Sequence, residues 1–308
     1  MMLEVRMCTF EMNEQRRLGA VVGDRIYDAN LARAAYLAAK KIATDPYLLA
    51  NAEVPSEMVA FIQGGDGSLL VVRTALAYLE EQGQDTGPSG EKIRYALGEV
   101  KLRTPIPHPG KLVCMGRIYQ GHLEASGLEN LGEPVYFIKP NVCIVGPDEP
   151  VLLPKVYPAR TTFGTELTLI VGKRMKNTPP AEVYDHIWGY TILNDVTLRG
   201  KPRTKNKMFN TSGPTGPWIV PKYQIKDPQN LRLQFRLNGK TIQDGNTNLM
   251  MWDIPTCVAE IAKYMTLEPG DIIATGDLGA TELLSPGDVM ECEVEGIGVL
   301  RNPVELEG

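Results

Sequence analysis

The chain has 308 residues, of which 43% are hydrophobic and 22% charged, a composition typical of soluble globular proteins that excludes a largely disordered chain. The net charge of −5 and the pI near 5.4 argue against a nucleic-acid-binding protein, which normally carries a surplus of basic residues. No run approaches the roughly 20 apolar residues that a membrane-spanning helix needs, and the acidic N-terminus does not predict a signal peptide.

Cysteine usage indicates the redox compartment. The five cysteines are odd in number, widely scattered and free of any CxxC pair: Cys8, Cys114, Cys143, Cys257 and Cys292. We therefore expect reduced thiols in a cytoplasmic protein, and neither a disulfide framework nor a zinc site.

Residues 1–105 predict a small N-terminal α+β domain. Two short apolar runs around Gly23 and Asp24 are typical of a β-hairpin. Residues 31–43 and 68–82 have apolar residues at helical spacing. The polar, glycine-rich residues 81–92 predict a loop.

Residues 106–308 consist mainly of short β runs separated by Gly and Pro, with few helical segments. Many short strands with regular turns favour a sandwich, roll or barrel over a wound parallel sheet. The predicted fold class is therefore α+β and mostly β, with the larger domain over residues 106–308.

One of these runs, "TTFGTELTLIVGKR" at residues 161–174, contains a single carboxylate among apolar and β-branched residues. Side chains two positions apart in a strand share one face, so Glu166 has Gly164 as its neighbour on that face. A buried acid is costly unless it is paired, which makes Glu166 a candidate for function.

Among the three histidines, His122 is the candidate general acid or base. It follows a predicted strand in "MGRIYQGHLEASG" and precedes a glycine-containing segment suited to a mobile lid. We interpret His108, between prolines, and His186, in a predicted helix, as surface or packing residues.

Further polar residues lie at strand ends or in unusual surroundings. Asp195 closes a predicted strand, where either a turn cap or a functional acid is plausible. Arg199 and Lys207 lie in a basic loop, which is either a solvated face or a source of cations for a carboxylate substrate. Lys139 is an isolated cation in an apolar strand, and Thr275 opens a glycine-rich turn that either binds an anion or is only a turn.

Together these motifs resemble the fumarylacetoacetate hydrolase family over nearly the whole chain. The matching strings include "KLVCMGRIYQGH", "PVYFIKPNVCIVGPDEPVLLP", "ELTLIVGKRMKN", "GYTILNDVT" and "MTLEPGDIIATG". The resemblance implies a mixed β-roll that is usually a homodimer, and a Mg²⁺ or Mn²⁺ ion that binds a 2-oxo or 1,3-diketo acid. Members hydrolyse C–C bonds, decarboxylate or tautomerise oxaloacetate-like acids, or dehydrate sugar acids.

The resemblance also assigns residues. The family's E-x-E strand falls on residues 164–166, so Glu166 resembles the second glutamate ligand and Gly164 stands where the first would be. Asp195 resembles the remaining carboxylate ligand. Arg117 and Tyr119 match the substrate-facing part of the first motif, Arg199 and Lys207 match basic residues of the substrate site, and His122 matches the lid histidine. With Lys139 and Thr275 added from their own surroundings, we expect Arg117, Tyr119, Lys139, Arg199 and Thr275 to bind substrate, and His122, Glu166 and Lys207 to form the catalytic set.

Several positions depart from the family pattern. Ala125 stands where a glutamate would pair with the lid histidine, and the segment from Asp195 to Lys207 is short, which predicts less cover over the site. Asn210 replaces an aspartate, and the turn "TGDLGA" introduces Asp277 as an additional carboxylate.

Because one glutamate of the family pattern is missing, the sequence leaves two alternatives for the cofactor, a bound metal ion or none. Mg²⁺ often binds through one or two carboxylates plus water and substrate oxygens, so Glu166 and Asp195 can suffice when a chelating substrate is present. Without an ion, the two acids would repel and one would keep its proton near neutral pH, giving an acid–base pair.

Three functions remain as alternatives. The first is an enzyme that acts on a small keto acid or diketone, such as an acylpyruvate, by C–C hydrolysis or related enolate chemistry. The second is a metal-independent lyase, decarboxylase or isomerase for a bulkier diketone, with a pocket enlarged by the short loop and by Gly164. The third is a non-catalytic relative that keeps only the fold.

Overall fold

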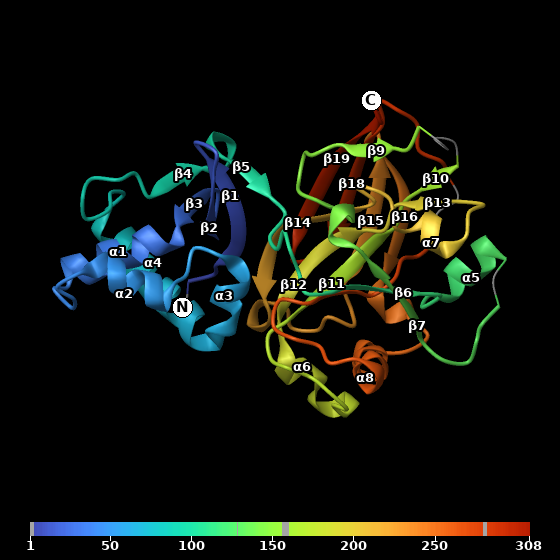
Figure 1. Cartoon of the computed structure of the whole chain (residues 1–308), viewed down its shortest axis with the longest axis horizontal. Coiled ribbons are helices and arrows are strands. Elements are labelled where there is room, and N and C mark those ends of the chain that lie inside the picture. The colour runs from blue at the N-terminus through green and yellow to red at the C-terminus, as the bar shows by residue number, and fades with distance from the viewer. Residues whose placement is uncertain (1–2, 128, 156–159, 280–281) are drawn as a thin grey trace.

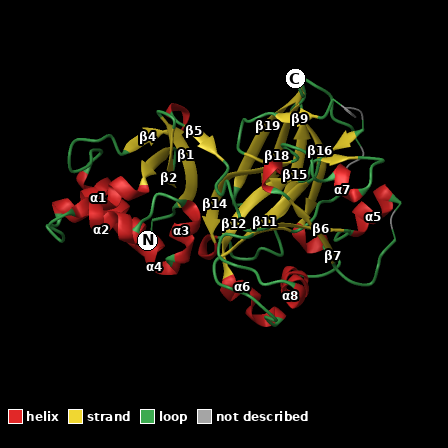
Figure 2. Ribbon diagram, viewed as in Figure 1, coloured by secondary structure: helices red, strands yellow, loops and turns green. Residues whose placement is uncertain are grey.

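The structure is a computed structural model of the whole chain that describes residues 3–127, 129–155, 160–279 and 282–308. Figure 1 shows two lobes side by side, with the N-terminal residues, in blue, forming the smaller one. In Figure 2, strands run through both lobes, while the helices extend along the lower side of the smaller lobe, from its outer end to the larger lobe, and around the margins of the larger one.

The smaller lobe combines a strand meander with a group of helices. Its strands are β1 (Arg6–Met12), β2 (Gln15–Val22), β3 (Arg25–Asp28), β4 (Arg94–Ala96) and β5 (Lys101–Arg103). Its helices are α1 (Ala29–Ala39), α2 (Pro46–Glu53), α3 (Met58–Gln63), α4 (Gly65–Gln82) and the 3₁₀ helix η1 (Leu97–Glu99). The predicted hairpin is confirmed, since β2 and β3 pair in antiparallel around Gly23. The two predicted helices are confirmed as α1 and α4, whereas α2 and α3 lie outside the predicted segments.

The larger lobe is mostly β, as predicted. Its strands are β6 (Leu112–Gly116), β7 (Val135–Lys139), β8 (Ile144–Val145), β9 (Val151–Leu153), β10 (Thr161–Thr162), β11 (Thr165–Val171), β12 (Ile187–Asn194), β13 (Thr197–Leu198), β14 (Gly213–Pro221), β15 (Arg232–Leu237), β16 (Lys240–Asn246), β17 (Ile272–Ala274), β18 (Val289–Val294) and β19 (Gly298–Leu306). Its helices are α5 (Gln120–Ser126), α6 (Val183–His186), α7 (Arg203–Asn206), α8 (Ile254–Tyr264), and the 3₁₀ helices η2 (Asn141–Cys143), η3 (Pro180–Glu182), η4 (Lys222–Gln224) and η5 (Thr247–Leu249).

Two sheets form the framework. The first has the strand order β4-β3-β2-β1-β14-β12-β11-β17-β6-β7, with β5 paired to β1 and β8 to β14. The second has the order β16-β15-β18-β19-β9, and β10 and β13 form a short separate ribbon. Leu167 and Leu169 of β11 belong to the same buried cluster as Leu233 and Phe235 of β15, so one face of the first sheet packs against the second.

The opposite face of β11 faces a different core. Ile170 lies in a buried cluster with Phe61 of α3 and Trp188 of β12, and these two aromatic rings contact edge to face with centroids 6.0 Å apart. Alternation along β11 places Glu166 on this same face, four residues before Ile170. The acid therefore lies at the end of a hydrophobic face that joins the two lobes.

The first sheet is continuous between the lobes, because β1 pairs with β14 at Met7 and Ile219. The chain passes from the smaller lobe to the larger one between the end of β5 at Arg103 and the start of β6 at Leu112. The division of the chain into two domains at residue 105 stays a prediction.

The described helices include none that is both long and apolar enough to cross a membrane. The five cysteines are buried and free. The homodimer and the cytoplasmic location stay predictions.

Candidate active site

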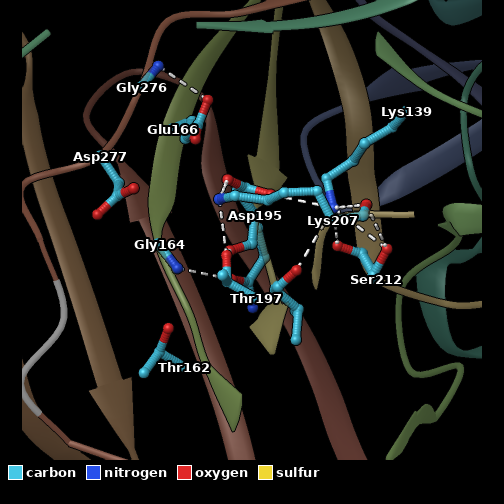
Figure 3. Close-up of polar contacts among 12 residues, drawn as sticks. Lys139, Thr162, Gly164, Glu166, Asp195, Thr197, Lys207, Ser212, Gly276 and Asp277 are labelled. Atoms are coloured by element: carbon cyan, nitrogen blue, oxygen red, sulfur yellow. Dashed lines mark hydrogen bonds and ion pairs between the residues drawn. The ribbon is translucent and has the colours of Figure 1, made fainter. Parts of the chain in front are cut away.

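Three carboxylates converge where neighbouring strands of the first sheet end. Glu166 belongs to β11, Asp195 directly follows β12, and Asp277 comes three residues after the end of β17. β11 lies between the other two strands in the sheet. One carboxylate oxygen from each residue lies within 4.8 Å of the others, and all three residues are buried (Figure 3).

Strand register explains how two of these acids meet. Glu166 of β11 is opposite Leu193 of β12, and the Asp195 amide N–H donates to the Gly164 carbonyl at 2.9 Å. Residues 193 and 195 share a face with residues 164 and 166 because side chains alternate along both strands. The structure therefore brings Glu166 and Asp195 together as the sequence predicts.

Glu166 forms no ion pair with a cationic side chain in the described part of the chain. Its Oε2 accepts a hydrogen bond of 2.8 Å from the Gly276 N–H, whereas its Oε1 is buried without a hydrogen-bond partner among the described residues. Burial raises the pKa of Glu166 well above its ordinary value, and the negative charges of Asp195 and Asp277 raise it further. In the absence of a cation, Glu166 therefore tends to keep its proton.

Asp195 is surrounded by positive charge instead. Lys139 Nζ lies 3.0 Å from Asp195 Oδ1, while Lys207 Nζ donates to Oδ2 and, at 2.7 Å, contacts Thr197 Oγ1. Burial alone would raise the pKa of Asp195, but the two lysines outweigh burial and hold this pKa below its ordinary value. Asp195 is therefore ionised at neutral pH.

Asp277 is paired with His122 of α5. The His122 Nδ1 lies 3.4 Å from Asp277 Oδ1 and 3.4 Å from the Asp277 carbonyl oxygen. Burial lowers the pKa of His122, yet Asp277 outweighs it and the net shift is upward. Conversely, burial raises the pKa of Asp277, and His122 brings this pKa below its ordinary value. The contacts with Asp277 use Nδ1 of the imidazole and not Nε2.

A cavity of about 230 Å³ opens beside the acids, with Asp195, Asp277 and His122 in its wall. Three cationic side chains also line it, namely Arg117, Arg199 and Lys207. Such a cavity suits a small anion, because arginine binds carboxylates in a bidentate manner. Apolar wall is supplied by Met115 and Phe137.

Arg117 lies in a strained position at the end of β6. Its backbone has φ 60°, in the left-handed region that is rare for residues other than glycine. Its guanidinium Nη1 donates to the Glu129 carbonyl at 3.0 Å, and the residue lines the cavity. Strain of this kind is often found in functional sites.

The family model for the fumarylacetoacetate (FAA) hydrolase C-terminal region matches residues 111–305, which is more than half of the chain and contains the whole site. The chain belongs to the fumarylacetoacetate hydrolase family.

Relatives within the family are similar over much of the chain. An uncharacterized protein of Pyrococcus abyssi is 41% identical over 208 residues, which are 65% of this chain and 92% of the relative. The mitochondrial oxaloacetate tautomerase of Xenopus laevis is 32% identical over 265 residues, which are 82% of this chain and 79% of the relative. Sequence similarity therefore extends into the smaller lobe.

A solved structure from the same family agrees in overall fold. Maleylpyruvate hydrolase from Sphingobium sp. SYK-6, in complex with manganese(II) and pyruvate, superposes with a TM-score of 0.76. It is 29% identical, and the comparison covers 98% of this chain and 100% of that chain. The predicted mostly β family fold is confirmed.

The structure corrects one expectation about the family's E-x-E position. Gly164 does not enlarge the pocket, because a Cβ at this position would lie only 2.5 Å from the Cγ of Asp277. The space left by the missing glutamate side chain is thus filled by another acid. The segment between Asp195 and Lys207, predicted to leave the site less covered, contains α7 and contributes Arg199, Lys207 and Asn206 to the cavity wall.

Three predicted substrate-binding residues do not line the cavity, namely Tyr119, Lys139 and Thr275, and the last two are engaged within the protein. Lys139 is fully buried behind Asp195 and donates to the carbonyl oxygens of Lys207 and Ser212. The Thr275 hydroxyl donates to the Leu167 carbonyl at 2.8 Å, so it is not free for a substrate. These two predictions of substrate contact are not supported by the geometry, since both groups are engaged within the protein.

Tyr119 lies close to the acids but is also buried. Its hydroxyl has no hydrogen-bond partner among the described residues, and burial raises its pKa, with a further contribution from Glu166. The sequence analysis did not identify Phe137, Thr197 or Asn206 as site residues. Strand periodicity offers a signal for two of them, since Phe137 precedes Lys139 by two residues and Thr197 follows Asp195 by two.

Proposed function

We propose that the protein is a metal-dependent enzyme that forms the enolate of a small 2-oxo acid carrying a second anionic or keto group. The observation that carries this proposal is the small cavity whose wall holds three cationic side chains together with Asp195 and Asp277, two members of the cluster of three buried carboxylates. The cations suit a carboxylate-bearing substrate, and the acids suit a divalent ion.

A divalent ion fits the residues present. Glu166 Oε1 is a buried, unpartnered carboxylate oxygen, which is costly unless a cation reaches it. The donor set consists of carboxylates, which favour Mg²⁺ or Mn²⁺ over softer metals. When bound, the ion would supply Lewis-acid stabilisation of negative charge on the substrate's keto oxygen. The manganese and pyruvate bound by the Sphingobium relative support this proposal.

The chain's own residues then have distinct roles. Arg117 and Arg199 bind and orient the substrate's carboxylate groups. Lys207 holds Asp195 in place and adds positive charge next to the developing enolate. His122 has its Nδ1 directed at Asp277, which leaves Nε2 to exchange a proton with the carbon next to the keto group.

Tautomerisation is the simplest reaction that this arrangement supports. His122 Nε2 takes one proton from the carbon next to the keto group, and the imidazolium so formed returns one proton to the keto oxygen, so His122 is regenerated and no water or second reactant is consumed. The similarity to oxaloacetate tautomerases points to the same class of chemistry.

Hydrolysis of a C–C bond in an acylpyruvate is a second candidate, favoured by one observation. His122 is paired with an acid, although that acid is Asp277 and not a residue of the same helix. Such a pair can take a proton from water, which adds to the distal keto carbon as the C–C bond breaks and leaves a carboxylate and the enolate of pyruvate.

Both reactions are tested with purified protein in the presence of Mn²⁺, Mg²⁺ or EDTA. Enol-to-keto conversion of oxaloacetate is followed by ultraviolet absorbance, and acylpyruvate cleavage by the two carboxylate products. We expect activity with an ion and its loss in EDTA. Activity that persists in EDTA would favour a metal-independent enzyme, and ligand binding without turnover of any compound would favour a non-catalytic relative.

A further inference from the structure

Gly164 and Asp277 occupy complementary positions beside the acid cluster. Gly164 shares a face with Glu166, so a side chain there would point into the same cluster of acids, toward Asp277. We propose that Asp277, from the turn after β17, serves as the third carboxylate ligand of the ion in the space that Gly164 leaves empty. This inference rests on the metal dependence proposed above and specifies which residues hold the ion.

The contacts at Gly164 are the first support. The three heavy atoms nearest to a Cβ at this position all belong to Asp277, with Cγ at 2.5 Å, Cβ at 2.6 Å and Oδ2 at 2.8 Å. Real Cβ atoms do not approach other atoms this closely, so a side chain at residue 164 and the present Asp277 exclude each other. One acidic side chain has therefore taken the position that a side chain at 164 would need.

Backbone geometry explains how the turn delivers this acid. Gly276 has φ 88°, a left-handed conformation that favours glycine, and its N–H donates to Glu166 Oε2 at 2.8 Å. The chain thus turns directly against Glu166 before it reaches Asp277. Asp277 Oδ1 then accepts a 2.6 Å hydrogen bond from the Gly279 N–H, which orients the carboxylate.

The two oxygens of Asp277 face different groups. Oδ1 is engaged with Gly279 and lies 3.4 Å from His122 Nδ1. Oδ2 is the Asp277 oxygen close to Gly164, 2.8 Å from a Cβ at that position. The buried Glu166 Oε1, which has no hydrogen-bond partner among the described residues, belongs to the same cluster of acids.

Electrostatics agrees with a bound dication. Glu166, Asp195 and Asp277 carry up to three negative charges when ionised, and the lysines beside them contact only Asp195. Among the described residues, no lysine or arginine forms an ion pair with Glu166 or Asp277, and His122 lies 3.4 Å from Asp277 Oδ1. A dication placed beside these two acids would neutralise the side that the lysines leave uncompensated.

The test exchanges the acid between the two positions. Mn²⁺ binding is measured by the loss of the free-ion electron paramagnetic resonance signal, with no substrate present, for the wild type, Asp277→Asn, Glu166→Gln and the double variant Gly164→Glu/Asp277→Gly. Glu282→Gln removes an equal charge from the same part of the chain, at a site where Glu282 lies 3.8 Å from Lys240, and serves as the control. Circular dichroism checks that each variant is folded.

We expect Asp277→Asn to weaken Mn²⁺ binding by about 100-fold, since even outer-shell partners of a metal typically contribute roughly 10- to 100-fold. The double variant should recover most of this loss, because removal of the Asp277 side chain makes room for a glutamate at 164. Glu282→Gln should bind as the wild type does. Wild-type affinity in Asp277→Asn, or loss that the double variant does not recover, would overturn the proposal and leave Asp277 as a partner of His122 only.

A second measurement detects the contact directly and does not depend on loss of binding. Asp277→Cys should bind Cd²⁺ with a new ultraviolet thiolate-to-metal absorption band, because thiolates favour soft metals. The wild type, whose five cysteines are buried, supplies the baseline. Absence of the band in a folded Asp277→Cys protein that still binds Cd²⁺ would contradict ligation at residue 277. If Glu166→Gln also leaves Mn²⁺ affinity unchanged, the proposed metal dependence itself fails, which is a separate outcome.

Discussion

One carboxylate oxygen of Glu166 and one of Asp195 lie within 4.8 Å of each other on one buried face of the sheet. Their surroundings nevertheless shift the pKa values of the two acids in opposite directions. Asp195 has two lysines in contact, and its pKa is lowered. Glu166 has one backbone N–H and two acidic neighbours, and its pKa is raised well above the ordinary value. The difference separates an acid whose charge the protein already balances from one whose charge requires an added cation.

The strongest test of this contrast removes the uncompensated acid. Glu166→Ala should reduce turnover by about 1,000-fold, because the Lewis-acid contribution of a bound ion is several kcal/mol and each 1.4 kcal/mol is about tenfold in rate. Turnover is measured at saturating Mn²⁺ with the substrate found active for the wild type. Unchanged activity in Glu166→Ala would remove the metal-dependent mechanism.

Removing a lysine that pairs with Asp195 should lower the free energy of unfolding. Lys139→Met leaves Asp195 without its fully buried partner and should lower the free energy of unfolding by about 3 kcal/mol, the usual cost of breaking a buried ion pair. Urea unfolding in the presence of EDTA, which removes any bound metal ion, measures the change. Lys207→Met is the matched comparison and should cost less, since this lysine lines the cavity and is partly exposed. An equal or larger cost for Lys207→Met would contradict the ranking.

His122 tests whether proton transfer and metal binding are separate. His122→Gln should reduce turnover by about 100-fold, a typical contribution of a general acid–base group, while Mn²⁺ affinity should fall by no more than about 10-fold, the lower end of what outer-shell partners of a metal contribute, because His122 contacts the proposed ligand Asp277. Steady-state kinetics and the Mn²⁺ titration together provide the readout. If affinity and turnover fall in parallel, the imidazole acts on the ion site and not on the substrate's proton.

The smallest expected effect concerns how the stability of the metal-free protein, kept in EDTA, depends on pH. The pKa of Glu166 is raised on folding, so the folded state holds its proton more tightly and the stability from this group is lost as pH rises above the ordinary glutamate pKa of about 4.3. Glu166→Gln does not titrate and should therefore be more stable than the wild type at neutral pH, by roughly 1 kcal/mol, a common size for single substitutions.

Thermal unfolding in EDTA across pH measures this difference. The gap between Glu166→Gln and the wild type should close near pH 4 and widen as the pH rises. Saturating Mn²⁺ should stabilise the wild type and leave the variant unchanged, because only a protein that binds the ion gains from it. If the stability difference between Glu166→Gln and the wild type narrows as the pH rises, the pKa of Glu166 is not raised on folding and its charge is balanced within the protein.

Local patterns predicted much of the site because it is built on strands. Alternation placed Gly164 and Glu166 on one face, and the structure brings Asp195 to that face from the neighbouring strand. The unusual cation Lys139 in an apolar strand indicated a buried charge, but it pairs with Asp195 and does not line the cavity. Periodicity identifies the face of a residue and cannot identify the partner that lies across from it.

Asp277 marks the limit of such reasoning. It is 111 residues from Glu166 in the sequence. The sequence shows that position 164 carries no acid, but no pattern in it indicates that Asp277 takes that place. The same holds for the acid that pairs with His122, which comes from the turn after β17 and not from three residues along α5. Both contacts depend on the order of strands in the sheet.

The amino-acid sequence by itself determined the mostly β class, the family, the strand face with its single glutamate, and the histidine beside it. These follow from short-range periodicity and from strings of residues that are read in order along the chain. Only the tertiary structure decided which acid fills the space at Gly164 and which acids share a cation. The reason is that electrostatic energy depends on distance and burial in three dimensions, and neither quantity is set by separation along the chain.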